Sequence, residues 1–142
     1  MMGNADVRFL ILKFLIIMEN GNQKFDLEDR LVAFACIILE VCDVLPNSRA
    51  GSNLEHQLSR SGTAPALMYG EAQSAESRAD FLHKMKMCLK ELRETRINLR
   101  IILEKPLVKH PKVDKAFEEV NQLIRIFVKS IETAKANNLL KK

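Results

Sequence analysis

Apolar residues recur at alternating intervals of four and three in several stretches of this chain, and prolines interrupt the pattern. Such spacing places an apolar stripe along one side of an α-helix, and that stripe has to be covered by another helix. Pro46 and Pro106 disfavour one continuous coiled coil, because proline disrupts the hydrogen bonding of a helix interior. The 142 residues include no Trp, one Tyr, five Gly and four Pro, which argues against a turn-rich β fold. The sequence therefore predicts an all-α protein, an antiparallel up-down-up-down four-helix bundle.

The first helix is expected to begin after Asp26, which is placed to cap it, and to end at Pro46. The second helix is expected to begin between residues 47 and 52, where Ser52 and Glu55 resemble a capping box, and to reach about residue 73. The stripe of the first helix consists of Leu27, Leu31, Phe34, Ile38, Val41 and Leu45.

The third helix is expected to start after Ser77, with Asp80 in the capping-box position, and to end at Pro106. The fourth begins near Pro111, since proline is favoured in a first helical turn, and frays from Asn137. The stripe of the third helix consists of Phe81, Met85, Cys88, Leu92, Thr95, Leu99 and Ile102. The stripe of the fourth consists of Val113, Phe117, Val120, Ile124, Phe127, Ile131 and Ala134.

Residues 1–24 are expected to form an extension, with the bundle spanning residues 25–142. The extension contains an apolar run at residues 7–18, VRFLILKFLIIM. This run is shorter than the ~20 apolar residues that span a bilayer, and Arg8 and Lys13 interrupt it. No small-residue cleavage site follows it, which disfavours a secretory signal. Two interpretations remain: an apolar extension, or translated upstream sequence with the true start at Met18.

The three cysteines, Cys36, Cys42 and Cys88, are widely spaced within apolar runs. Their number is odd, and no Cys-x-x-Cys or Cys/His spacing suggests a zinc site. We expect buried, reduced thiols in a cytoplasmic protein.

Basic residues concentrate in one part of the chain. Residues 78–112 contain ten Lys and Arg against four Asp and Glu, whereas the whole chain carries a formal charge of +4. Lys86, Arg93 and Arg100 recur every seven residues and form one stripe, with neighbours about 10.5 Å apart at 1.5 Å per residue. Lys90 lies beside it, and Arg96 is expected to approach the helix interface. This surface predicts phosphate-backbone binding, unless acids such as Glu94 pair with the bases on a solvated face.

Several apolar residues fall outside the stripes. Met87, Ile97 and Ile101 are expected on outer faces of the third helix, and Ile126 and Val128 on those of the fourth. A contiguous set of exposed apolar side chains usually marks an interface, so the pattern indicates self-association.

Arg60 and Glu71 are eleven residues apart, or three helical turns, and therefore point in one direction. Glu91 on the next helix is placed to complete an ion-pair set with Arg60. We expect these three charges to fix helix register or protomer contacts, with an anion or ligand site as the other interpretation.

The sequence offers no convincing catalytic or metal site. Asp80 and His83 form a single half of the motif found in di-iron bundles, which requires two such units and two further inward carboxylates. Gly70 has no partner glycine for a phosphate loop. We therefore expect no enzyme activity, no metal and no cofactor.

The region from residue 57 to 95 reads QLSRSGTAPALMYGEAQSAESRADFLHKMKMCLKELRET and resembles the bacterial four-helix bundle proteins encoded within intervening sequences of large-subunit rRNA genes. The likeness covers about residues 25–139. Met68 and Ala64 stand where that family usually has Asn and Ser, so part of any buried polar network is absent here. The matching residues are Gln57, Leu58, Arg60, Ser61, Glu71, Ala72, Ser77, Asp80, Phe81, Lys90, Glu91, Leu92, Glu94 and Thr95.

The resemblance implies an antiparallel bundle that assembles into a ring-like homopentamer. It also implies distant kinship with the accessory variability determinant of diversity-generating retroelements, a basic pentamer that binds nucleic acid and a reverse transcriptase. The resulting expectation is a non-catalytic homo-oligomer that associates with RNA or DNA as an accessory or scaffold protein. The alternative is a protein-interaction module with no nucleic-acid role and no contact with membranes.

Overall fold

The computed structural model describes the backbone of residues 26–140 and the side chains of residues 26–136. It contains four α-helices: α2 (Leu27–Val44), α3 (Arg49–Gln73), α4 (Arg78–Glu104) and α5 (Pro111–Leu140). This part of the chain has no β-strand, so the prediction of an all-α four-helix protein is confirmed. The expected extension at residues 1–24, with its alternative start at Met18, lies outside the described residues.

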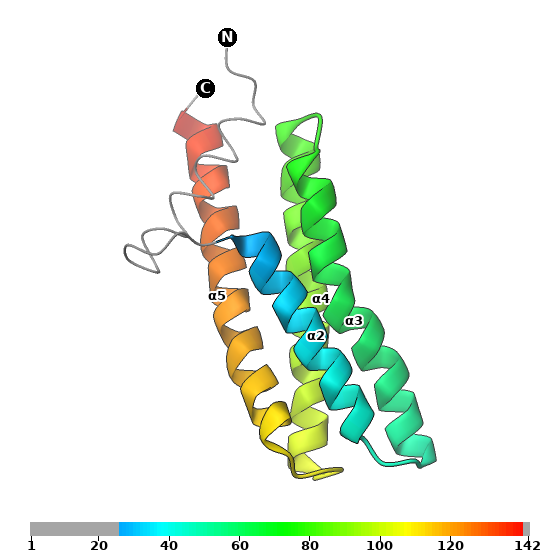
Figure 1. The fold of residues 1–142 in the computed structure, drawn as a ribbon. Coiled ribbons are helices and arrows are strands. Elements are labelled where there is room, and N and C mark those ends of the chain that lie inside the picture. The colour runs from blue at the N-terminus through cyan, green and yellow to red at the C-terminus, as the bar shows by residue number, and fades with distance from the viewer. Residues whose placement is uncertain (1–25, 141–142) are drawn as a thin grey trace.

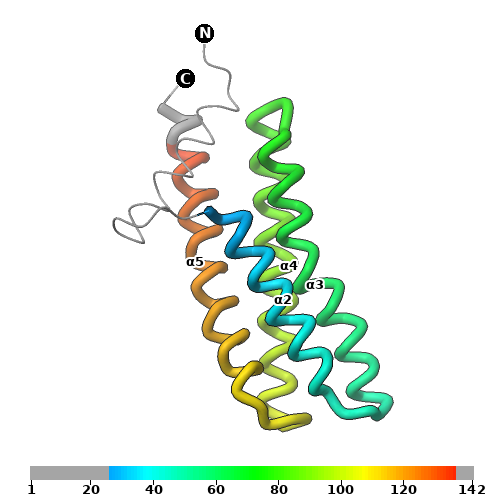
Figure 2. Tube along the Cα trace, viewed as in Figure 1, coloured from blue at the N-terminus to red at the C-terminus, as the bar shows by residue number. Residues whose placement is uncertain are grey.

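The four helices pack side by side as a bundle (Figure 1). Each short connection turns the chain back, so that helices consecutive in sequence run in alternating directions, as the trace in Figure 2 shows. α4 packs against α3 and α5, and α2 closes the bundle by packing against the same two helices. Because α2 is the shortest, the other three helices extend beyond its first residue (Figure 1).

Side-chain caps define three of the helix starts. Asp26 accepts a hydrogen bond from the Glu28 amide at 2.9 Å, and Ser77 accepts one from the Asp80 amide at 3.0 Å, as the sequence indicates. The predicted capping role of Ser52 is wrong. Ser48 caps α3 by accepting from the Gly51 amide at 3.1 Å, which places Ser52 inside the first turn.

Gly51 explains why α3 begins so soon after Pro46. A Cβ atom at Gly51 would lie 1.9 Å from the Pro46 carbonyl oxygen, so no larger residue fits there without moving the backbone. The turn between α2 and α3 can therefore be tight only because this position lacks a side chain. The Ser52–Glu55 pattern in the sequence gives no sign of this close approach.

The predicted stripes form the core. All seven stripe residues of α4 are buried, as are Leu27, Leu31, Phe34, Ile38 and Val41 of α2. In α5 the apolar face is wider than the predicted stripe, because an α-helix drifts relative to a strict seven-residue repeat. Phe117 and Ile124 are half-buried, while Ala116, Leu123 and Ile126 are buried. The expectation that Ile126 faces outward is therefore wrong; its exposed fraction is 5%.

A bidentate ion pair joins α2 to α5. Arg30 Nη2 lies 2.7 Å from Glu119 Oε1, and Arg30 Nε donates to Glu119 Oε2 at 3.0 Å. The same guanidinium also donates to Gln122 Oε1 at 2.7 Å. The sequence alone does not indicate this contact, because its members are about ninety residues apart.

The cysteines divide into two classes. Cys42 and Cys88 are buried, as expected, but Cys36 is exposed on the outer side of α2. All three are free thiols. Among the helices that the structure describes, none is long and apolar enough to cross a membrane.

Candidate nucleic-acid interface

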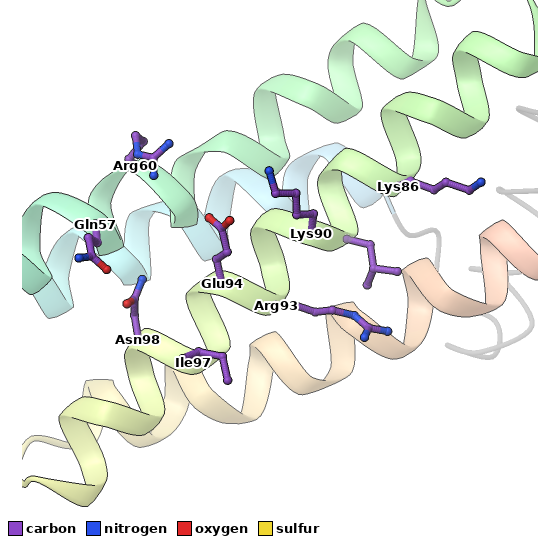
Figure 3. Close-up of a pocket in the computed structure, with 9 residues that line it drawn as sticks. Gln57, Arg60, Lys86, Lys90, Arg93, Glu94, Ile97 and Asn98 are labelled. Atoms are coloured by element: carbon purple, nitrogen blue, oxygen red, sulfur yellow. The ribbon is translucent and has the colours of Figure 1, made fainter.

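A groove of about 730 Å³ lies between α3 and α4, and it collects much of the basic charge (Figure 3). We call it the α3/α4 groove. Its basic side chains are Arg60 from α3 and Lys86, Lys90 and Arg93 from α4. The other lining residues are Gln57, Leu89, Glu94, Ile97 and Asn98, so a single carboxylate faces four cationic groups.

A second hollow of about 660 Å³ lies between α4 and α5. Arg93 lines both hollows, so it stands on the ridge of α4 that separates them. The second hollow also presents Arg96 and Arg125, together with the polar groups Glu118, Asn121 and Gln122.

The five predicted basic residues lie in three different surroundings. Lys86, Lys90 and Arg93 are exposed and line the α3/α4 groove. Arg100 Nε donates to Glu104 Oε2 at 2.8 Å, so a neighbouring carboxylate compensates its charge.

Arg96 is directed toward α5. Its Nε donates to Asn121 Oδ1 at 2.7 Å, and its guanidinium carbon lies 5.5 Å from the centre of the Phe117 ring. These contacts join α4 to α5 through a hydrogen bond and a cation–π interaction. Arg96 therefore contributes to helix packing as well as to the basic surface.

Of the predicted set of Arg60, Glu71 and Glu91, the charge of Arg60 acts on Glu91, whereas Glu71 has a different partner. Glu71 forms an ion pair with Lys84 at 3.6 Å, while Arg60 is exposed at the α3/α4 groove. Within residues 26–136, no ion pair of 4.0 Å or less joins Arg60 to either carboxylate. Eleven residues of helix correspond to about 16 Å, which exceeds the reach of the two side chains although they point the same way.

Glu91 is a buried acid with one unpartnered oxygen atom. Its exposed fraction is 8%, and its Oε2 atom is buried without a hydrogen-bond partner. Burial raises the pKa of Glu91 above its ordinary value, and the neighbouring Glu94 raises it further through its charge and a side-chain hydrogen bond, against the opposing charges of Arg60 and Lys90. The neutral form of this side chain is therefore more favourable in the folded protein than in the unfolded chain.

Beside Glu91, hydroxyl groups connect α3 and α4. Thr95 Oγ1 lies 2.9 Å from Ser61 Oγ and 2.8 Å from the Glu91 carbonyl oxygen, and both hydroxyl-bearing residues are buried. Buried hydroxyl groups that satisfy one another fix the helix register without an uncompensated charge. Thr95 and Ser61 thus fix helix register, a role that the sequence predicts for the charged side chains Arg60, Glu71 and Glu91.

The predicted outer apolar residues are exposed to different degrees. Ile97 and Ile101 have exposed fractions of 48% and 45%, whereas Met87 is half-buried. Three further large apolar side chains, Val32, Leu39 and Leu67, are exposed on α2 and α3 and were not singled out from the sequence. These three residues lie outside the apolar positions that the spacing of four and three predicts.

Carboxylates cluster at the start of α2. In the part of the chain that the structure describes, one trio of potential metal ligands lies within 4.8 Å, namely the exposed residues Asp26, Glu28 and Asp29. Asp26 already caps α2, and acidic groups are favourable at a helix N-terminus. The trio is therefore explained by helix capping.

The comparisons with known proteins agree with the fold and with the sequence resemblance. The model of the family described as 23S rRNA-intervening sequence protein matches residues 23–129. Among curated proteins, none matches this chain significantly. A similar solved structure is that of a protein of unknown function from the S23 ribosomal protein family of Bacteroides thetaiotaomicron. The two chains are 26% identical with a TM-score of 0.67, over 73% of this chain and 96% of the other.

Neither description indicates an enzymatic family. The family match covers most of the bundle, from the residues before α2 to residue 129 within α5. This chain therefore belongs to the family of 23S rRNA-intervening sequence proteins.

Proposed function

We propose that the protein is a non-catalytic, homo-oligomeric four-helix bundle that associates with RNA or DNA in the cytoplasm as an accessory or scaffold protein. The observation that carries this proposal is the convergence of Arg60, Lys86, Lys90 and Arg93 on one groove that contains a single carboxylate, Glu94. Cationic side chains that face a shared groove attract a phosphate backbone, and binding releases its condensed counterions.

Two features distinguish this surface from an ordinary solvated helix face. The four bases come from two helices, so they line a hollow and do not follow one helix alone. None of the four forms an ion pair of 4.0 Å or less within the described residues, whereas Arg30, Lys84, Arg100 and Lys112 each do. Bases that form no close ion pair in a concave site focus the electrostatic field on an anionic partner.

Binding of labelled RNA and DNA at several salt concentrations tests the proposal. The triple variant Lys86→Glu/Lys90→Glu/Arg93→Glu should bind at least tenfold more weakly, and its plot of log K against log salt should be shallower by about 2 for single strands. The matched control is Arg49→Glu/Lys115→Glu/Lys135→Glu, which changes the charge equally at exposed residues that line neither hollow. Equal losses in both variants, or no binding by the parent, would contradict the proposal.

The oligomeric part of the proposal rests on the exposed apolar residues of α4. Ile101 is close to half exposed on the outer side of a helix, and it is near Ile97 along the same helix. Side chains of this size usually become buried when they form a contiguous set, and a second copy of the chain is the simplest partner. The resemblance to the family points to five copies.

Native mass measurement tests the assembly. Ile101→Glu should lower the mass toward that of the monomer, because it places a charge in the contact. Leu39→Glu is the matched control, since Leu39 has an exposed fraction of 46% on a different helix, compared with 45% for Ile101. A monomeric parent, or dissociation by Leu39→Glu alone, would contradict an α4 interface.

A protein-interaction module is the second function that the surface supports. Leu67, with an exposed fraction of 72%, lies on α3 and does not line the α3/α4 groove. A dedicated protein partner that remains bound after nuclease treatment, and that Leu67→Glu releases, would favour this alternative.

A further inference from the structure

The α3/α4 groove is not uniform along its length. Arg60, Gln57, Glu94 and Asn98 gather toward one end, whereas Lys86 and Arg93 lie toward the other (Figure 3). The labelled polar groups at the second end are both basic. The first end offers hydrogen-bond donors and acceptors beside the apolar side chain of Ile97, which is a composition that phosphate binding does not require.

Asn98 is the best-placed polar group at the first end. Its exposed fraction is 6%, and it lines the groove, so its small accessible area faces the hollow. Within the described residues, no hydrogen bond reaches its carboxamide. A nearly buried carboxamide that opens on a groove without a protein partner is free to bond a ligand, and it supplies both donors and an acceptor.

Glu94 lies one helical turn before Asn98, on the same side of α4, and it also faces the groove. Across the groove, Gln57 directs one amide hydrogen toward Asn53 Oδ1 at 3.5 Å, which leaves its carbonyl oxygen available. The acceptors at this end include the Glu94 carboxylate and the Gln57 carbonyl oxygen, so a ligand group that presents adjacent N–H bonds can bind to them.

The exposed Arg60 side chain also offers a planar surface for a ring of the ligand. Arg60 is exposed, and no acid holds its guanidinium plane within 4.0 Å in the described chain. Guanidinium planes stack on nucleobases, so the exposed Arg60 side chain offers a base a planar contact. This contact takes the place of an aromatic side chain, since none lines the groove.

From this juxtaposition we propose that the first end of the α3/α4 groove binds an unpaired guanine base of a single-stranded nucleic acid. The Watson–Crick edge of guanine presents two adjacent donors, N1–H and the exocyclic amine, which match the two oxygens of the Glu94 carboxylate. Its O6 atom accepts a hydrogen bond, which the Asn98 carboxamide can donate. Adenine and cytosine each present one amine on that edge and cannot satisfy both carboxylate oxygens. The phosphates next to this guanine would then lie along the basic side chains of Lys86 and Arg93 at the other end. This inference therefore rests on the proposed nucleic-acid binding.

The test compares three labelled single-stranded ten-nucleotide RNAs by fluorescence anisotropy with the full chain. One has a single guanine within adenines, the second has inosine at that position, and the third is adenine throughout. Inosine differs from guanosine only by the absence of the exocyclic amine. We expect the guanine oligonucleotide to bind about tenfold more tightly than the other two, in line with the value of one bidentate contact. Equal binding of guanine and inosine would overturn the proposal.

Glu94→Gln separates base recognition from general electrostatics. Removal of a negative charge should leave or improve binding of the all-adenine RNA, but it should reduce the ratio of guanine to inosine affinities to about 1. Glu118→Gln, an exposed acid of the second hollow, is the matched control and should keep the tenfold ratio. If Glu94→Gln strengthens all three RNAs equally and keeps the ratio, the proposal is wrong. If no RNA binds the parent at all, the proposed function itself fails.

Discussion

Gly62 of α3 lies directly against Ile38 of α2, so closely that a Cβ atom at Gly62 would come within 2.5 Å of Ile38 Cγ2. The same atom would lie 2.8 Å from Ile38 Cγ1 and 2.9 Å from its Cβ, so rotation of the Ile38 side chain cannot relieve the overlap. Ile38 is fully buried in the core. The distance between α2 and α3 therefore depends on the absence of a side chain at this position.

We predict that Gly62→Ala destabilises the protein by ~1–3 kcal/mol, because the two helices must separate to admit the methyl group. Gly70→Ala is the matched control in the same helix, since nothing lies within 4 Å of its added Cβ. That variant should gain ~0.5–1 kcal/mol from the better helix propensity of alanine. Denaturant unfolding at fixed protein concentration measures both changes, and a shift of the same sign in both variants would contradict the close packing.

Glu91 should make stability depend on pH. Burial raises its pKa above the ordinary value of 4.5, so the folded protein keeps this proton to a higher pH than the unfolded chain does. Folding then loses stability as pH rises from 4.5 through the raised pKa, and the loss is constant above that window. Glu91→Gln, which cannot ionise, should be more stable than the parent by ~1–2 kcal/mol at about pH 8 and equal to it near pH 4.

Unfolding free energies of the parent and of Glu91→Gln, measured from about pH 4 to about pH 8, provide the test. Glu132→Gln on α5 is an exposed control, and its difference from the parent should be small at every pH. A difference between the parent and Glu91→Gln that stays flat over this range would show that the carboxylate is compensated in solution.

The three cysteines should differ in reactivity. Burial raises the pKa of Cys42 to about 11 and that of Cys88 to about 12, so both remain thiols at pH 8 and are shielded from reagents. Cys36 is exposed. Brief treatment of the native protein with iodoacetamide at pH 8 should therefore add one group per chain, and treatment in guanidinium chloride should add three. Cys36→Ser should remove the native adduct; modification of Cys42 or Cys88 at a comparable rate would contradict their burial.

Arg96 and Arg100 should behave differently although both belong to the basic part of α4. Arg96→Gln removes the hydrogen bond to Asn121 and the contact with the Phe117 ring, so we expect a loss of ~1–2 kcal/mol. Arg100→Gln breaks an exposed pair with Glu104 and should cost less than ~0.5 kcal/mol. Thermal unfolding of the two variants makes the comparison, and equal losses would mean that Arg96 does not join α4 to α5.

Much of the architecture follows from local periodicity. The spacing of Phe81, Met85, Cys88 and Leu92 places them on one side of a helix wherever that helix packs, and all four are buried. Pro46 and Ser77 likewise mark a helix end and a helix start through their own backbone chemistry. These features depend on residues a few positions apart, which is why the number of helices, most of their bounds and most of the core could be predicted.

The set of residues that line the α3/α4 groove cannot be predicted from the spacing of residues along one helix. The spacing of Lys86 and Arg93 can be seen in the sequence of α4. Whether they line one groove with Arg60 depends on the distance and the register between α3 and α4, which contacts such as Thr95–Ser61 help to fix. The same is true of Arg96, whose partner Asn121 is twenty-five residues away. The sequence by itself determined which residues face inward along each helix. Only the tertiary structure decided which outward charges share a groove, because side chains on different helices meet at distances set by packing between them.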